Sequence, residues 1–168
     1  MVTLYQGLPK ADKMEMIAQK TTELGVYAIQ PVAMERCVVK LEGKDAGKKI
    51  ERWQKIAASA AEQSGRGVIP RVIVLGSFKA ALSRAAQADT SILLYENERA
   101  TTLKMALEAK PLTTVSLISG PEGGLEEREV EQAKNAGVQI CTLGKRILRC
   151  ETASLCAVSA VMYAAGEF

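Results

Sequence analysis

A glycine-rich segment at residues 119–124 is the part of this sequence that most directly indicates a ligand site. It holds three glycines and a proline between an apolar, β-branched run and the acidic pair Glu126 and Glu127, so it joins a strand to a helix. Glycines permit positive φ angles and let a ligand approach the main chain, whose N–H groups can bind a purine edge, a ribose or a carboxylate. Neither G-x-x-x-x-G-K-[ST] nor G-x-G-x-x-G is present, so no known phosphate-binding loop is indicated. A tight structural turn is the alternative interpretation.

A second segment, residues 143–153, also lies between a predicted strand and a predicted helix. It is longer than the ordinary connection of about 4–6 residues. The pattern predicts a loop that is itself packed and that directs one or two arginines into a site, whereas a basic loop with an apolar staple before the helix is the alternative. The cations and apolar residues of this loop are Lys145, Arg146, Ile147, Leu148 and Arg149.

A third strand end, residues 94–97, is expected beside these two segments, because the carboxyl ends of parallel strands lie on the same side of a sheet. Ligands of such sheets bind beyond these carboxyl ends. Chemistry at such a site must proceed without imidazole, since the chain has no histidine. Histidine-dependent triads, metal sites and general bases are thereby excluded.

The four cysteines do not form a metal site in this sequence. Cys37, Cys141, Cys150 and Cys156 contain no C-x-x-C pair, and we interpret them as buried or half-buried free thiols. No apolar leader precedes Lys10, and the most apolar stretch, 153–165, is too short for a membrane span of roughly 20 residues. We therefore expect no metal, no membrane role and a reducing, cytoplasmic location.

The elements that must position these segments alternate between helix and strand. The 168 residues are 48% hydrophobic and 24% charged, as expected for one globular domain. Alternation predicts an α/β fold with a mostly parallel sheet, and residues 40–48 are expected to be a mobile loop. The predicted helices are 10–24, 50–64, 79–86, 102–109, 126–136 and 152–163, and the predicted strands are 27–33, 71–75, 91–95, 113–118 and 138–142.

Positive charge is concentrated between Arg36 and Arg84, although the net charge is only +3. Such a concentration is typical of a surface that binds a polyanion. A solvated, lysine-rich loop and helix face is the alternative.

Several separated motifs follow one another from about residue 8 to the end of the chain. They are 20–26 (KTTELGV), Pro31, 35–37 (ERC), 61–66 (AEQSGR), 69–70 (IP), 120–124 (GPEGG) and 143–153 (LGKRILRCETA). In this order they resemble the bacterial 16S rRNA (uracil-N3)-methyltransferases of the RsmE family, which belong to the SPOUT class.

This resemblance implies a fold that periodicity cannot show: a parallel sheet with helices on both faces and a deep C-terminal trefoil knot. It also implies a homodimer that uses S-adenosylmethionine as cofactor to methylate a uridine in 16S rRNA of the 30S ribosomal subunit. By the same resemblance residues 1–168 correspond to the catalytic domain, and the family's N-terminal PUA-like RNA-binding barrel is absent from the chain. Weak or absent rRNA methylation by this chain alone is then expected, because cationic contacts are missing.

The resemblance places the methyl donor against the three strand ends that the residues themselves had indicated. The implied cofactor-binding residues are Leu94, Tyr95, Glu96, Ser119, Gly120, Pro121, Glu122, Gly123, Gly124, Leu143, Gly144, Ile147, Leu148, Thr152 and Ala153. Backbone groups of such loops can recognise adenine without a particular side chain.

The implied chemistry assigns catalytic roles to Arg149, with Glu122 and Glu151 as weaker candidates. Arg149 would stabilise the uracil anion, and the two carboxylates would orient Arg149 or accept the N3 proton. As alternatives, Arg149 neutralises the donor's carboxylate and Glu122 caps the helix that follows. The candidate RNA-binding residues are Arg36, Arg66, Lys145 and Arg146. Two other functions stay open: methylation of another nucleoside such as a tRNA ribose, and a non-catalytic ribosome assembly factor.

Overall fold

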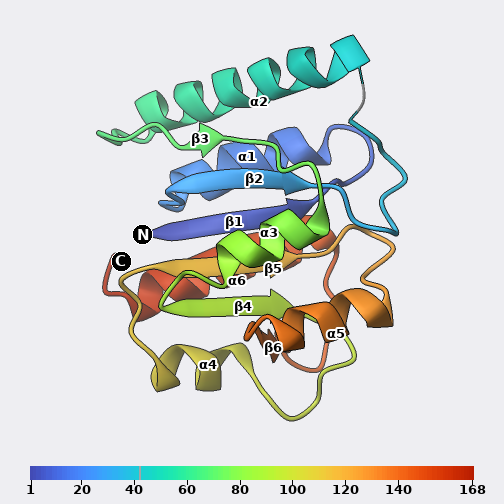
Figure 1. Ribbon diagram of the computed structural model, residues 1–168. Helices are drawn as coiled ribbons and strands as arrows, with labels where there is room; N and C mark the ends of the chain where they lie inside the picture. The colour runs from blue at the N-terminus through green and yellow to red at the C-terminus, as the bar shows by residue number, and fades with distance from the viewer. Residues whose placement is uncertain (42) are drawn as a thin grey trace.

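A computed structural model describes residues 1–41 and 43–168 and contains six strands and six helices in alternation (Figure 1). This confirms the predicted α/β class. The strands are β1 (Val2–Gly7), β2 (Ala28–Val32), β3 (Arg71–Val72), β4 (Thr90–Leu94), β5 (Val115–Ser119) and β6 (Gln139–Cys141). The helices are α1 (Lys13–Glu23), α2 (Gly43–Gln63), α3 (Phe78–Ala85), α4 (Leu103–Ala109), α5 (Glu127–Asn135) and α6 (Cys150–Ala164).

All strand pairs in the sheet are parallel, in the order β3-β2-β1-β5-β4-β6. β1 lies in the middle of this order and pairs with β2 on one side and β5 on the other (Figure 1). No strand was predicted before residue 10, whereas the structure has β1 at Val2–Gly7. Thr3 and Gln6 interrupt its apolar pattern, although all of it except Thr3 is buried.

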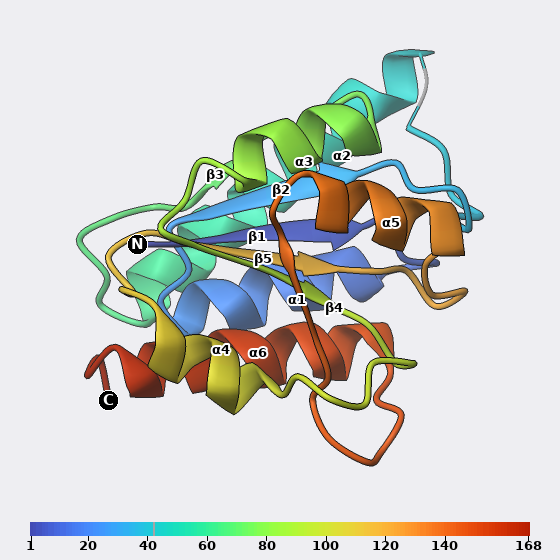
Figure 2. The ribbon, with the colours of Figure 1, turned by 60° about the horizontal axis from the view of Figure 1, so that its bottom comes forward.

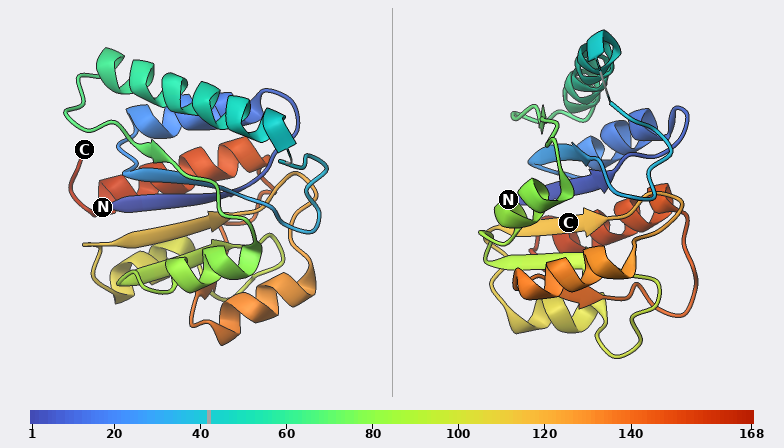
Figure 3. Two further views of the ribbon diagram at one scale, coloured as in Figure 1. Left: turned by 45° about the horizontal axis from the view of Figure 1, so that its top comes forward. Right: turned by 45° about the vertical axis from the view of Figure 1, so that its right-hand side comes forward.

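Helices cover both faces of the sheet (Figure 2). α1, α4 and α6 lie on one face, with α2 packed against α1, and they enclose a core that includes Leu4, Ile29 and Leu117. α3 and α5 lie on the other face over Tyr5 and Ile118. Figure 3 shows α6 running along the sheet on the α1 side, where it contacts α1, β1 and β5. The knot implied by the resemblance stays a prediction.

Two expectations about local structure were wrong. α2 begins at Gly43, so most of the predicted loop 40–48 is helical; Glu42, within that range, lies outside the described residues. Lysine-rich helical turns are stable here because later residues of the same helix, such as Trp53 and Ala57, are buried against the core. All four cysteines are free thiols as expected, but Cys156 is exposed because it lies on the outward side of α6.

Candidate active site

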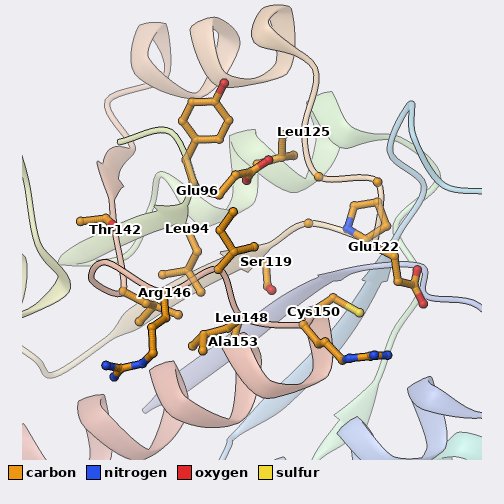
Figure 4. Close-up of a pocket in the computed structure, with 18 of the residues that line it drawn as sticks. Leu94, Glu96, Ser119, Glu122, Leu125, Thr142, Arg146, Leu148, Cys150 and Ala153 are labelled. Atoms are coloured by element: carbon orange, nitrogen blue, oxygen red, sulfur yellow. The ribbon is translucent and has the colours of Figure 1, made fainter. Parts of the chain in front are cut away.

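The carboxyl ends of β4, β5 and β6 surround one cavity of about 480 Å³ (Figure 4). β4 lies between β5 and β6, so the segments after these three strands are brought together by strand order alone. The first turn of α6 closes the fourth side, where Cys150 and Ala153 line the cavity. The expectation that residues 94–97, 119–124 and 143–149 meet at one site is supported by this arrangement.

Almost all of the candidate residues line this cavity. Thr152 and Glu151 do not line it, although both lie in the first turn of α6 beside residues that do. The candidates that line it are Leu94, Tyr95, Glu96, Ser119, Gly120, Pro121, Glu122, Gly123, Gly124, Leu143, Gly144, Lys145, Arg146, Ile147, Leu148, Arg149 and Ala153.

The glycine-rich loop 120–124 is folded tightly over the end of β5. The Gly124 N–H donates to the Pro121 carbonyl at 2.9 Å, and Gly124 has a φ of +71°. A Cβ at Gly124 would lie 2.5 Å from Glu96 Oε1, so a side chain there would meet the loop that follows β4. The glycines thus allow two strand-end loops to lie against each other, which is more than a turn alone requires.

Glu122 belongs to a charged cluster that joins this loop to α1 and α6. Its Oε1 accepts the Lys10 N–H at 3.0 Å and lies 3.0 Å from Lys13 Nζ, which also lies 3.3 Å from Glu151 Oε2. Burial raises the pKa of the Glu122 carboxyl, but its own N–H, the Lys10 N–H and Lys13 outweigh burial and leave the pKa below its ordinary value. Glu122 is therefore an ionised carboxylate.

Glu151 is held in the same way. Burial raises its pKa, whereas its own N–H, the Cys150 thiol and Lys13 lower it, and the net pKa is below the ordinary value. The thiol of Cys150 lies 3.2 Å from Glu151 Oε2. Burial, followed by this hydrogen bond, raises the pKa of Cys150 to about 12, so Cys150 stays a neutral thiol and is no nucleophile near pH 7.

Helix α5, which follows loop 120–124, is capped by Glu126 and Glu129 and not by Glu122. Glu129, in the first turn of α5, accepts the Glu126 N–H at 3.0 Å, and the Glu126 carboxylate takes part in the reciprocal capping contact. The alternative in which Glu122 caps α5 is therefore wrong, because Glu122 faces Lys10 and Lys13 instead.

Arg36 holds the outer side of loop 120–124. Its Nη1 donates to the Gly123 carbonyl at 3.0 Å, and its Nε lies 2.8 Å from Glu126 Oε1. Arg36 does not line the cavity, and its guanidinium is used to fasten the loop.

The loop between β6 and α6 carries three cations that contact no partner in residues 1–41 and 43–168. Within the described part of the chain, Lys145, Arg146 and Arg149 make no ion pair and no side-chain hydrogen bond, although all three line the cavity. The loop is less packed than expected: Ile147 is 83% exposed, because the chain here stands over the cavity opening and not over the core. In Figure 4, Arg146 and Glu122 lie on opposite sides of the site, with Leu94, Ser119 and Leu148 between them.

Arg66 is not brought to the site. Its Nη1 donates to the Thr22 and Val26 carbonyls at 2.8 and 2.9 Å, and its Nη2 donates to the Gly25 carbonyl at 3.2 Å. Thr22 lies in the last turn of α1, and Gly25 and Val26 lie between α1 and β2. All three are near the amino ends of the strands, whereas the cavity lies at the carboxyl ends. A cation beside these carbonyls is favourable, because carbonyl groups at the carboxyl end of a helix carry partial negative charge.

Sequence reasoning missed several residues of the site. Lys13 lines the cavity from the start of α1, and it escaped notice because β1 was not recognised, so the β1–α1 connection was not counted among the strand ends. Gln6 and Ser154 were missed because they lie beneath the cavity lining, where both are fully buried. The other lining residues that the analysis did not name as candidates are Arg99, Leu125, Thr142 and Cys150.

The cavity lining combines apolar surface with charged side chains. Leu94, Leu125 and Leu148 supply apolar surface, and five cations against two carboxylates among the lining residues favour a negatively charged molecule at the opening. Among the described residues, no group of three or more acidic, cysteine or histidine side chains could hold a metal ion. In the same residues no helix is long and apolar enough to span a bilayer.

Comparison with known proteins agrees with this geometry. The family model described as an RNA methyltransferase domain matches residues 1–162. The chain is 44% identical over 167 residues to ribosomal RNA small subunit methyltransferase E of Bacillus subtilis, covering 96% of this chain and 65% of that protein. It is 35% identical over 154 residues to the protein of the same name from Mesomycoplasma hyopneumoniae, covering 92% of this chain and 66% of that protein.

A solved structure shows the same fold. The crystal structure of a ribosomal RNA small subunit methyltransferase E from Neisseria gonorrhoeae bound to S-adenosyl methionine superposes with a TM-score of 0.85 at 40% identity, covering 96% of this chain and 65% of that one. The chain thus spans slightly less than two thirds of the length of these relatives. The matched domain, the identities and the shared fold show that this chain belongs to the RsmE family of RNA methyltransferase domains.

Proposed function

We propose that this chain is the catalytic domain of an S-adenosylmethionine-dependent methyltransferase that acts on N3 of a uridine in 16S rRNA of the small ribosomal subunit. The observation that carries the proposal is the single cavity built from loops 94–97, 119–124 and 143–149. Family membership supports methylation of small-subunit rRNA, because relatives that match nearly the whole chain are named ribosomal RNA small subunit methyltransferase E.

The cavity fits S-adenosylmethionine in size and in chemistry. Its volume of about 480 Å³ is in the range of cofactor sites. Leu94, Leu125 and Leu148 provide apolar contacts for an adenine ring, and the main chain of 120–124 and 143–144 provides hydrogen-bonding groups. In loop 120–124 a Cβ at Gly123 or Gly124 would lie within 3.0 Å of a neighbouring protein atom. Tyr95, Glu96, Ile147, Thr152 and Ala153 complete the proposed binding set.

When bound, S-adenosylmethionine supplies an electrophilic methyl group, so the protein has to position the acceptor and help it lose a proton. Uracil N3–H has a pKa on the order of that of tyrosine. The guanidinium of Arg149 has no protein partner among the described residues and lines the cavity. We assign it to the carbonyl oxygens of the base, where it stabilises the anion.

Glu122 and Glu151 take a supporting role. Both are ionised and both pair with Lys13. Against the effect of burial, the N–H of each residue, and after it Lys13 among other groups, holds the pKa of each carboxyl below its ordinary value. A carboxylate of low pKa is a weak base but a strong hydrogen-bond acceptor. Glu122, which lines the cavity, is therefore proposed to receive the N3 proton only transiently, on its way to solvent. Glu151 does not line the cavity and is proposed to act through its ion pair with Lys13.

RNA is proposed to approach across Lys145 and Arg146. These two exposed cations lie at the cavity opening and have no protein partners among the described residues. Arg36 and Arg66, the other two candidates, are each bound to protein carbonyls, so we propose that their contribution to RNA binding is smaller.

A homodimer is proposed through the outward side of α6. Leu155, Cys156, Ser159 and Tyr163 recur there at helical spacing, and Tyr163 is 75% exposed. An exposed stripe of small and apolar residues on a helix is typical of an interface between protein chains.

Replacement of Arg149 tests the proposed function. Arg149→Ala should reduce methylation of 30S subunits at least 100-fold in the full-length enzyme, in keeping with loss of a group that stabilises the developing charge, while S-adenosylmethionine binding changes less than about threefold. Arg71→Ala is the matched control, because Arg71 is an exposed arginine on β3 at the far edge of the sheet.

The readout is 3-methyluridine in rRNA, measured by nucleoside mass spectrometry. Unchanged turnover of the Arg149 variant would show that the arginine has another role. Ribose-methylated tRNA as product, or binding to the subunit without any binding of S-adenosylmethionine, would replace the proposal by one of the two other functions.

A further inference from the structure

Three polar side chains are buried together beneath the cavity. Gln6 of β1 and Ser154 of α6 are 0% exposed, and Ser119 of β5 is 2% exposed. Burial of polar groups costs free energy unless their hydrogen bonds are satisfied, so such a group requires specific partners.

The partners form a continuous chain of hydrogen bonds. Gln6 Nε2 donates to the Gly7 carbonyl at 2.9 Å and to the Gly120 carbonyl at 3.3 Å. Gln6 Oε1 accepts from the Ser154 hydroxyl, and the Ser154 and Ser119 hydroxyl oxygens lie 2.9 Å apart. If Ser119 donates to Ser154 and Ser154 donates to Gln6, each hydroxyl proton is used once.

This chain joins two walls of the cavity that are far apart in sequence. Ser119 and Gly120 begin the glycine-rich wall, and Ser154 follows Ala153, which lines the cavity from α6. Gln6 itself does not line the cavity. Its amide holds the Gly120 carbonyl toward the interior and holds the first turn of α6 at the same time.

We propose that Gln6 is a positioning residue for the methyl donor: through Ser154 and the Gly120 carbonyl it fixes the distance between loop 120–124 and the first turn of α6. The inference depends on the proposed function, because the molecule so positioned is S-adenosylmethionine. Without Gln6 the Ser119–Ser154 contact and the outer Glu122–Lys13–Glu151 cluster still join the two walls, but the Gly120 carbonyl loses its side-chain donor and Ser154 loses its amide acceptor.

The chain offers a matched control on the neighbouring strand. Gln30 of β2 is 4% exposed and is therefore buried like Gln6. It pairs in register with Tyr5, so its side chain lies on the other face of the sheet from that of Gln6. Its Oε1 has no hydrogen-bond partner among the described residues, and it does not line the cavity.

The test compares Gln6→Met with Gln30→Met, since methionine keeps the side-chain length and removes the amide. S-adenosylmethionine binding to the 168-residue chain is measured by titration calorimetry. Gln6→Met should weaken binding about tenfold or more, equivalent to about 1.4 kcal/mol, and Gln30→Met should change it less than twofold. Ser154→Ala, a smaller change, should weaken binding severalfold, and it serves as the test if Gln6→Met does not fold.

Hydrogen exchange on the free protein distinguishes positioning from general destabilisation. In Gln6→Met, exchange should accelerate at the amides of loop 120–124 and the first turn of α6, with the amides of α2 unchanged. Equal binding by wild type, Gln6→Met and Ser154→Ala would overturn the inference, as would a uniform acceleration in all helices. Failure of the wild-type chain to bind S-adenosylmethionine would instead contradict the proposed function.

Discussion

Gly7 ends the central strand at the point where Pro121 packs against it. A Cβ built on Gly7 would lie 2.7 Å from both the ring Cδ and the backbone nitrogen of Pro121, and 2.8 Å from Met34 Sδ. The methionine side chain can turn away, but the backbone of Pro121 cannot yield without displacing the loop. Gly7→Ala should therefore shift loop 120–124 outward and disturb the cavity that Pro121 lines.

The cost can be bounded from this geometry. Adding a methyl group to a closely packed site costs roughly 1–3 kcal/mol of stability. For a domain of this size, that range corresponds to a decrease in melting temperature of roughly 3–10 °C. Because the displaced backbone belongs to the proposed donor site, S-adenosylmethionine affinity should fall by at least about tenfold.

Gly47→Ala is the matched control, since a Cβ at Gly47 in α2 would meet nothing within 4 Å. An alanine is favoured over a glycine within a helix by about 1 kcal/mol, so this variant should melt slightly higher than wild type and bind normally. Differential scanning fluorimetry and calorimetry measure both quantities. A Gly7→Ala protein with wild-type stability and affinity would refute the view that the contact with Pro121 sets the loop position.

Two further predictions concern charged residues. Lys13→Met removes one of the groups that lower the pKa of Glu122 and Glu151. Stability from a lowered carboxyl pKa is present above the unfolded-state value and is lost as pH falls through the folded-state value. The variant should therefore melt lower than wild type near pH 7, with a difference that shrinks as the pH falls below about 4, and a difference that is the same at every pH would contradict the assignment. Arg66→Met removes hydrogen bonds to three carbonyls and should lower the free energy of unfolding by about 1–3 kcal/mol in urea titrations; unchanged stability would show that these bonds contribute nothing.

Much of the fold follows from local pattern in the sequence. Helices such as α5 and strands such as β5 were predictable because each has its own periodicity and clear end signals. β1 was not predictable in this way, since Thr3 and Gln6 break its apolar run and only its place between two other strands explains their burial. The start of α2 was missed for a related reason: its first turns are polar, and burial of later residues stabilises them.

The loops that line the site were predictable from the sequence, but the residues on other elements that hold these loops in place were not. Glycine content and position after strands identified loop 120–124, because those signals are local in the sequence. Partners such as Lys13 for Glu122 and Ser154 for Gln6 depend on which strands are neighbours. No local pattern contains that information, so the contact between the Arg36 guanidinium and the Gly123 carbonyl was not predicted either.

The central position of β1 has a consequence for the order of folding. Leu4 pairs with Ile29 of β2, which is close in the chain, and with Leu117 of β5, which is synthesised much later. During translation β1 and β2 can pair early, whereas the other edge of β1 stays open until β5 leaves the ribosome. Pairings between distant segments slow folding, and an open strand edge attracts other chains. The nascent domain is therefore most prone to aggregation before β5 has been synthesised and has paired with β1.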